Sequence, residues 1–244
     1  MTGGVQIDIR SNVQEVRRWL DDAQKKQLPY ATVYAMTLTA KDARTEEISV
    51  MQRVFDKPTP YTLNALQVKP ATKRTMVAKV EFKEGFRGTP AKRYLNPHVN
   101  GGPRSQKSSE LQIAPLLKGY SYLVPARGIP LNQYGNVPGG TLRKVISQLG
   151  VSRNADANAS GSRRSKGNRK AQAFFVSKRG DMVMQRKGKT VTPFLVGVKA
   201  PQYQKRFPFY ETAQAVIKQR LPVNFEVAFQ RAMATSGSKG KWTP

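Results

Sequence analysis

The sequence predicts an α+β fold: a long N-terminal helix, a hairpin, an antiparallel meander and a C-terminal helix, with a loop-rich insertion. Three observations support this prediction. Residues 30–56 contain neither glycine nor proline, residues 171–198 hold three short apolar runs separated by turn residues, and residues 208–234 return to helical spacing. No internal repeat is visible.

Two helices are expected at the start of the chain. Residues 11–27 place Val13, Val16, Leu20 and Ala23 on one face at helical spacing. Residues 30–56 form the longest candidate helix, which also carries small side chains at every fourth position, namely Ala31, Ala35, Thr39 and Ala43. This small-residue stripe either packs against another helix or forms a subunit contact in an oligomer.

A hairpin and a loop-rich insertion (84–150) are expected next. Strands at 66–69 and 76–82 flank a turn at 70–73. Residues 84–104 are interpreted as loop that ends in a rigid elbow (93–104), because the Gly101-Gly102-Pro103 run fits neither a helix nor a central strand. Beyond the elbow we expect a helix ended near Pro115, a glycine- and proline-rich crossing, and a short helix over 141–149.

The second half of the chain begins with a change of composition. Residues 151–170 are basic and, apart from Val151, lack large apolar side chains, so they are interpreted as a flexible basic loop between the 1–150 region and the rest. Residues 171–234 are expected to form the meander and the C-terminal helix, which packs on the first region and is interrupted at Pro222. The tail, 235–244, is expected to be mobile.

The composition points to a polyanionic partner. Among 244 residues there are 42 lysines and arginines against 15 acids, a net charge of +27, which far exceeds what solubility needs. Nucleic acid, an anionic membrane or an acidic protein would each balance such a charge. No apolar run approaches the roughly 20 residues of a membrane helix, and the chain has no cysteine for a disulfide or a thiolate metal site.

Catalytic motifs are not found. His98 is the sole histidine, and a triad or a histidine metal site would need partners for it, so we interpret it as structural or surface. Gly188-Lys189-Thr190 resembles the end of a phosphate-binding loop, but Val183 stands where that loop needs its first glycine. Asp21-Asp22 and Glu46-Glu47 fit solvated helix faces. We therefore expect no catalytic residue, cofactor or metal, and no enzyme.

Basic residues concentrate from position 153 to 189. They either form a solvated surface or contact a phosphate backbone or an acidic partner, and no motif for sequence-specific recognition accompanies them. The candidate contacts are Arg153, Arg163, Arg164, Lys166, Arg169, Lys170, Lys178, Arg179, Arg186, Lys187 and Lys189.

An ordered set of segments resembles a known family. Residues 174–176 (Phe-Phe-Val), 182–186 (Met-Val-Met-Gln-Arg), 192–194 (Thr-Pro-Phe) and 220–230 (Arg-Leu-Pro at its start) resemble the minor tail protein Z, or tail-completion, proteins of tailed bacteriophages. The likeness covers residues 171–234 and, loosely, 30–56. Residues 59–72 and 94–104 resemble structural proteins of phages and prophages, including short-tailed phages, whereas the 84–150 insertion is longer than the tail-completion pattern.

The resemblance implies a structural virion protein at the head-to-tail junction (neck) or tail, assembled in the host cytoplasm. Such proteins form homo-oligomeric rings around the channel through which the double-stranded DNA genome passes, and they contact portal, adaptor or tail proteins and no membrane. On this basis the elbow is expected to contact a neighbouring copy or the next ring through Arg93, Tyr94, Pro97, His98 and Arg104.

Two other functions remain open on the sequence alone. A free nucleic-acid-binding protein without sequence preference would carry the same charge, and its affinity would fall steeply with salt. A nuclease would need clustered acids and a divalent ion, so metal-dependent activity lost on substituting Asp21 or Glu46 would support it.

Overall fold

The computed structural model describes residues 27–84 and 90–236, which form a mixed fold of helices and antiparallel sheets, as predicted. The helices are α2 (Leu28–Val54), α3 (Pro60–Leu63), α4 (Ala91–Asn100), α5 (Ser108–Ile113), α6 (Gly139–Leu149), α7 (Arg163–Ala171) and α8 (Phe209–Ser236). The strands are β1 (Leu66–Lys69), β2 (Lys79–Phe82), β3 (Gly102–Pro103), β4 (Tyr122–Pro125), β5 (Ala173–Val176), β6 (Met182–Lys187), β7 (Thr190–Val198) and β8 (Gln202–Tyr203). The helix expected over 11–27 lies almost wholly outside the described residues, as does most of the 235–244 tail.

The described chain divides into two compact units. The first unit takes residues 27–51, 64–82 and 208–236, and so joins α2, the β1–β2 hairpin and α8. The second unit takes residues 52–63 and 83–207, and holds the remaining helices and strands.

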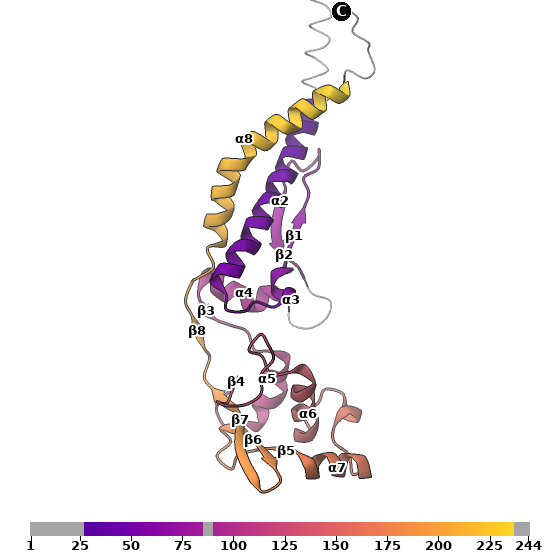
Figure 1. The fold of residues 1–244 in the computed structure, drawn as a ribbon, viewed down its shortest axis with the longest axis vertical. Coiled ribbons are helices and arrows are strands. Elements are labelled where there is room, and N and C mark those ends of the chain that lie inside the picture. The colour runs from indigo at the N-terminus through magenta and orange to yellow at the C-terminus, as the bar shows by residue number, and fades with distance from the viewer. Residues whose placement is uncertain (1–26, 85–89, 237–244) are drawn as a thin grey trace, which may run out of the picture. The chain divides into compact units, whose positions relative to one another are not determined.

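Helices α2 and α8 of the first unit pack through small side chains, and their ribbons run side by side in Figure 1. Ala31 and Ala35 on α2 meet Ala228 and Ala232 on α8, and all four are fully buried. Because alanine lets two helix backbones approach closely, the small-residue stripe packs against a helix of the same chain. The structure therefore supports the interpretation that the stripe packs against another helix, rather than the interpretation that it forms a subunit contact.

Polar contacts fix the register of these two helices and of the hairpin. Asn224 of α8 is buried and donates from Nδ2 to Oγ1 of Thr39 at 3.1 Å and to Oδ2 of Asp42 at 2.8 Å. Arg44 donates from Nε to the carbonyl of Leu66 at 3.0 Å, which holds β1 against α2. Strands β1 and β2 pair antiparallel, so the predicted hairpin is confirmed, although β2 begins at Lys79 and the connection is longer than the predicted turn at 70–73.

The second unit contains a four-stranded antiparallel sheet in the order β4-β7-β6-β5. The predicted meander is β5-β6-β7, and β4 joins it as an edge strand that the sequence did not predict, because glycine and proline surround it. One face of the sheet buries Phe174, Val183 and Phe194 against Ile113 of α5 and Val145 of α6. Figure 1 shows α5 and α6 beside the strands.

A second cluster of this unit forms around α4. His98 accepts hydrogen bonds at its carbonyl from the backbone N–H groups of Arg206 and Phe207, both at 2.9 Å. Phe55 packs edge-on against Phe207, and Gly102 and Pro103 pair with β8. Gly101 follows the last residue of α4 with φ +79°, a backbone conformation that residues with side chains rarely adopt, so the first elbow glycine is required by the backbone.

Two loop predictions were wrong. Residues 91–100 form α4, which tolerates Pro97 because Ala91, Leu95 and Val99 are buried beside it and repay the lost backbone donor. The elbow thus begins as a helix and turns only at Gly101. The expected basic loop contains α7, which has no buried residue and begins at Ser162, whose Oγ accepts from the N–H of Ser165 at 3.2 Å.

Candidate nucleic-acid interface

Helix α7 displays five of the predicted basic residues, all of them exposed: Arg163, Arg164, Lys166, Arg169 and Lys170. Two local features support a helix that buries nothing. Ser162 caps its first turn, and Arg169 and Lys170 lie in its last turn, where positive charge interacts favourably with the helix dipole. Arg169 also donates from Nη2 to the carbonyl of Ser160 at 3.2 Å.

The register of the sheet adds three more cations near the end of α7. Ala173, two residues beyond α7, pairs with Arg186, and β6 then ends at Lys187, which is followed by Lys189 in the β6–β7 turn. Arg169, Lys170, Arg186, Lys187 and Lys189 therefore gather where β5 begins and β6 ends, and we call these five residues the basic sheet end. All five are exposed.

The other predicted basic residues lie elsewhere. Lys178 and Arg179 occupy the β5–β6 turn, at the opposite end of the same sheet. Arg153 precedes the 3₁₀ helix Ala155–Ala157 and donates its backbone N–H to Oε1 of Gln112 at 3.1 Å. The candidate contacts therefore do not form a single patch. They form two groups at opposite ends of β6, and Arg153 lies apart from both.

The basic sheet end carries uncompensated charge. Within residues 27–84 and 90–236, none of its five side chains forms an ion pair with a carboxylate. The guanidinium of Arg186 lies over the ring of Phe175, 5.2 Å from its centre, which leaves the charge intact. Such a surface can neutralise phosphates without reading bases.

The five elbow residues play different roles in the second unit. Arg93 is exposed on α4, Pro97 is buried, and Tyr94 donates or accepts a hydrogen bond with Oγ1 of Thr62 at 3.3 Å. His98 is half-buried between Phe55 and Tyr203. The side chain of Pro97 is therefore buried within its own chain, and among the five elbow residues only Arg93 is exposed.

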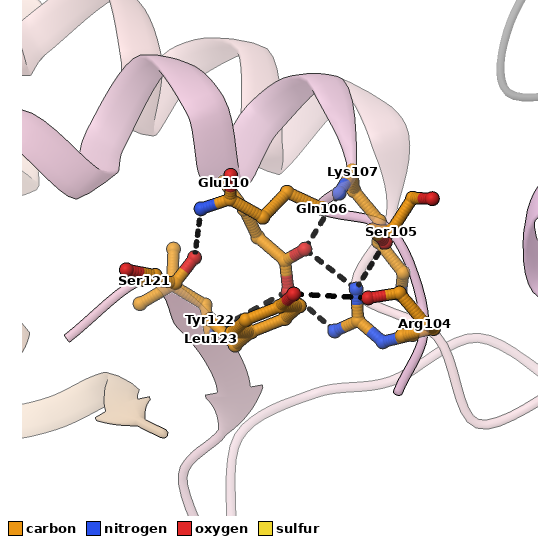
Figure 2. Close-up of polar contacts among 8 residues, drawn as sticks. All are labelled: Arg104, Ser105, Gln106, Lys107, Glu110, Ser121, Tyr122 and Leu123. Atoms are coloured by element: carbon orange, nitrogen blue, oxygen red, sulfur yellow. Dashed lines mark hydrogen bonds and ion pairs between the residues drawn. The ribbon is translucent and has the colours of Figure 1, made fainter. Parts of the chain in front are cut away.

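Arg104 is only 8% exposed and belongs to a buried polar cluster (Figure 2). Its Nη1 and Nη2 donate to Oε2 and Oε1 of Glu110 at 2.6 and 2.5 Å. Glu110 also accepts from the backbone N–H groups of Lys107 at 2.6 Å and Leu123 at 3.1 Å. Burial alone would raise the pKa of Glu110, but these bonds outweigh it and hold the pKa below its usual value.

His98 and the acids show no arrangement for metal binding in the described ranges. Among residues 27–84 and 90–236 there is no group of three or more histidines, aspartates or glutamates that could hold a metal ion. Burial, and then the charge of Arg206, lower the pKa of His98 to about 4. Within the same ranges, no helix combines the length and the apolar character needed to span a membrane.

A cavity in the second unit involves residues that sequence reasoning missed. Lys57, Tyr203 and Arg206 line it together with the elbow residues His98 and Arg104. These residues come from segments up to about 150 positions apart with no motif at any of them, so no signal in the sequence could have grouped them.

Comparison with protein-family models, with curated proteins and with solved structures finds no match to this chain.

Proposed function

We propose that this chain is a structural protein of a tailed-phage virion, a ring-forming subunit of the neck or tail that contacts double-stranded DNA without sequence preference. The observation that carries the DNA contact is the basic sheet end, where Arg169, Lys170, Arg186, Lys187 and Lys189 meet without ion-pair partners among the described residues. The place in the virion rests on the resemblance of residues 171–234 to tail-completion proteins.

The geometry of the basic sheet end suits a phosphate backbone. The register of β5 and β6 brings lysines and arginines at the end of β6 and on the β6–β7 turn close to those on the last turn of α7, and no acid lies among residues 163–173 and 185–190. Each phosphate neutralised by such a residue releases counterions, so the affinity for DNA depends on salt. A subunit that lets DNA slide past needs this kind of contact and no base readout.

Exposed apolar side chains on α8 support self-association. Tyr210, Ile217, Val223 and Val227 are 57%, 46%, 50% and 51% exposed, although each is large and apolar. Soluble monomers seldom leave so much apolar surface along one helix, and a neighbouring copy in a ring would cover it.

The experiment that tests the proposal is a measurement of composition and mass. Purified phage particles should contain the chain at a fixed copy number. The mass of the isolated protein, measured by light scattering, should be that of a closed oligomer. A chain absent from particles, monomeric in solution and bound to nucleic acid in lysate would overturn the structural proposal.

That second outcome would favour the alternative, a free nucleic-acid-binding protein without sequence preference. The basic sheet end supports this function equally, because phosphate contacts need no ring. The two proposals therefore differ in stoichiometry and not in the residues that contact DNA.

A further inference from the structure

A cavity of about 520 Å³ lies in the second unit, away from the basic sheet end. Its walls come from the segment before α3 and from α3 itself, from α4, from the segment between β3 and α5, from the turn at 134–136, and from β8 and the segment after it. This volume is in the range of sites that enclose small organic ligands.

Arg206 is held in place at this cavity by three contacts. Its Nε donates to Nδ1 of His98 at 3.1 Å, and its guanidinium carbon lies 5.2 Å from the centre of the Phe55 ring. Its backbone N–H donates to the carbonyl of the same His98 at 2.9 Å. Because the guanidinium is fixed through Nε, its Nη1 and Nη2 groups remain available as a pair of parallel donors, the Nη1–Nη2 fork. Neither nitrogen has a hydrogen-bond partner among the described residues.

His98 can hold Arg206 only while its Nδ1 carries no proton. Burial is the larger reason why its pKa falls to about 4, and the charge of Arg206 lowers it further. At neutral pH the imidazole is therefore an acceptor, and the edge of Tyr203, 4.8 Å away between ring centres, fixes its plane. His98 acts here as a positioning residue.

Two more cations line the cavity. Lys57 has φ 45°, a left-handed backbone conformation that is uncommon for a residue other than glycine. Lys107 also lines the cavity, and burial, then the nearby charge of Arg104, lower the pKa of its ammonium group. Asp56 is the acid in the lining, and Arg104 is already neutralised by Glu110. The cavity is thus net positive.

Aromatic rings make up much of the remaining wall. Tyr61, Tyr94, Tyr134 and Tyr203 all line the cavity, and Tyr61 is 52% exposed. An inorganic anion or an acidic peptide would use the cations but would have no use for these rings. A nucleobase gains from stacking on an aromatic ring, whatever its identity.

We propose that this cavity binds a nucleotide, with a phosphate group on the Nη1–Nη2 fork of Arg206 and the base against the tyrosine walls. The nucleotide is either free in solution or one unit of a single strand, because both present the same phosphate and base. This site is separate from the basic sheet end, and its failure would leave the proposed function untouched.

The test is calorimetric titration of the full chain with deoxyadenosine monophosphate, with deoxyadenosine and with inorganic phosphate. We expect the monophosphate to bind with a Kd below about 1 mM and at least about tenfold more tightly than either fragment. A short oligodeoxyadenylate that binds more tightly still would identify the single strand as the source. Absence of binding by the monophosphate, or equal binding by inorganic phosphate, would overturn the proposal.

Variants assign the binding to the cavity. Arg206→Gln should weaken the affinity for deoxyadenosine monophosphate about tenfold or more. Arg206→Lys should weaken it nearly as much, because a lysine has no pair of N–H donors that could bind one phosphate together. Lys57 is exposed, so Lys57→Gln removes no buried contact, and it should weaken the affinity for the monophosphate several-fold. Arg127→Gln removes the same charge from an exposed site outside the cavity and should have no effect.

If Arg127→Gln and Arg206→Gln weakened binding equally, the effect would be one of net charge and the proposal would be wrong. Binding of a glutamate-rich peptide without binding of the nucleotide would also contradict it. Duplex DNA binding by Arg206→Gln, measured in parallel, should keep the wild-type salt dependence, which separates this site from the basic sheet end.

Discussion

Arg104 and Glu110 form a bidentate ion pair with distances of 2.5 and 2.6 Å, and both side chains are buried. The pair joins the residues after β3 to α5, and Glu110 extends the link to β4 through the N–H of Leu123. Tyr122 completes the cluster by donating its hydroxyl to the carbonyl of Arg104 at 2.9 Å, as Figure 2 shows. One carboxylate thus connects three segments of the second unit.

We predict that Glu110→Gln lowers the free energy of unfolding by about 3–5 kcal/mol, because it leaves the guanidinium of Arg104 buried without a counter-charge. Urea denaturation measures this loss. Glu81→Gln is the matched control, since Glu81 pairs with Lys69 on the surface of the first unit and should leave the midpoint nearly unchanged. Equal effects of the two substitutions would show that Arg104 is solvated when Glu110 is absent.

Glu47 makes the stability of the first unit depend on pH. The solvated face predicted for Glu46-Glu47 is wrong for Glu47, whose side chain is fully buried in α2. Neither of its carboxylate oxygens has a hydrogen-bond partner among residues 27–84 and 90–236. Burial, and then the charges of Glu46 and Glu211, raise its pKa to about 8. The folded chain therefore holds a proton there that the unfolded chain loses above its ordinary value near 4.5.

The contribution of Glu47 to the free energy of unfolding is therefore most favourable below pH 4.5, and it becomes less favourable as the pH rises from 4.5 to about 8. The decline is at most about 1.4 kcal/mol per pH unit for one proton. Glu47→Gln should remove this decline and raise the thermal midpoint at pH 8 more than at pH 5. A wild-type midpoint that the substitution shifts equally at both values would contradict the prediction.

The strongly patterned elements could be predicted from sequence. Helices α2 and α8 are long and the strands β5, β6 and β7 are separated by clear turn residues, so their existence follows from local pattern. The interruption predicted at Pro222 is wrong, because α8 continues through that residue. Helix α4 escaped prediction because Pro97 argues against a helix and only burial of its neighbours reverses that argument. Helix α7 escaped because it has no apolar face, and its capping serine is a weaker signal than its composition.

The sequence predicted which basic residues belong to the candidate site, but it did not predict how they are arranged in space. The eleven basic residues are all exposed, as a charged surface requires. Their division between the two ends of the sheet depends on the pairing of Ala173 with Arg186, and register is a property of the paired strands that no single segment contains. The cavity at Arg206 depends on contacts such as that with His98, 108 positions away.

Gly197 tests the packing of the sheet. A β-carbon at this position in β7 would stand 2.7 Å from the carbonyl oxygen of Asp181 and 2.8 Å from the β-carbon of Tyr120. Gly197→Ala should therefore destabilise the chain by about 1–3 kcal/mol, as overpacking does. Gly140→Ala, at the start of α6 with nothing within 4 Å of its β-carbon, is the matched control and should not lower the thermal midpoint.

The two ends of the sheet should contribute unequally to DNA binding. Arg186→Gln combined with Lys187→Gln removes two charges from the basic sheet end, where Arg169, Lys170 and Lys189 lie close by. If both residues contact phosphates, the slope of log K against log salt should become shallower by about 2. Fluorescence anisotropy with duplexes of two unrelated sequences measures this slope.

The pair Lys178→Gln and Arg179→Gln removes the same charge from the opposite end of the same sheet. Because those residues lie a full strand away from α7, we expect a change in slope well below that of the first pair. Both double variants should bind the two duplexes equally, since neither pair is proposed to read bases. Equal changes in slope for the two pairs would mean that DNA contacts the whole sheet, and a difference between the duplexes would refute a contact limited to phosphates.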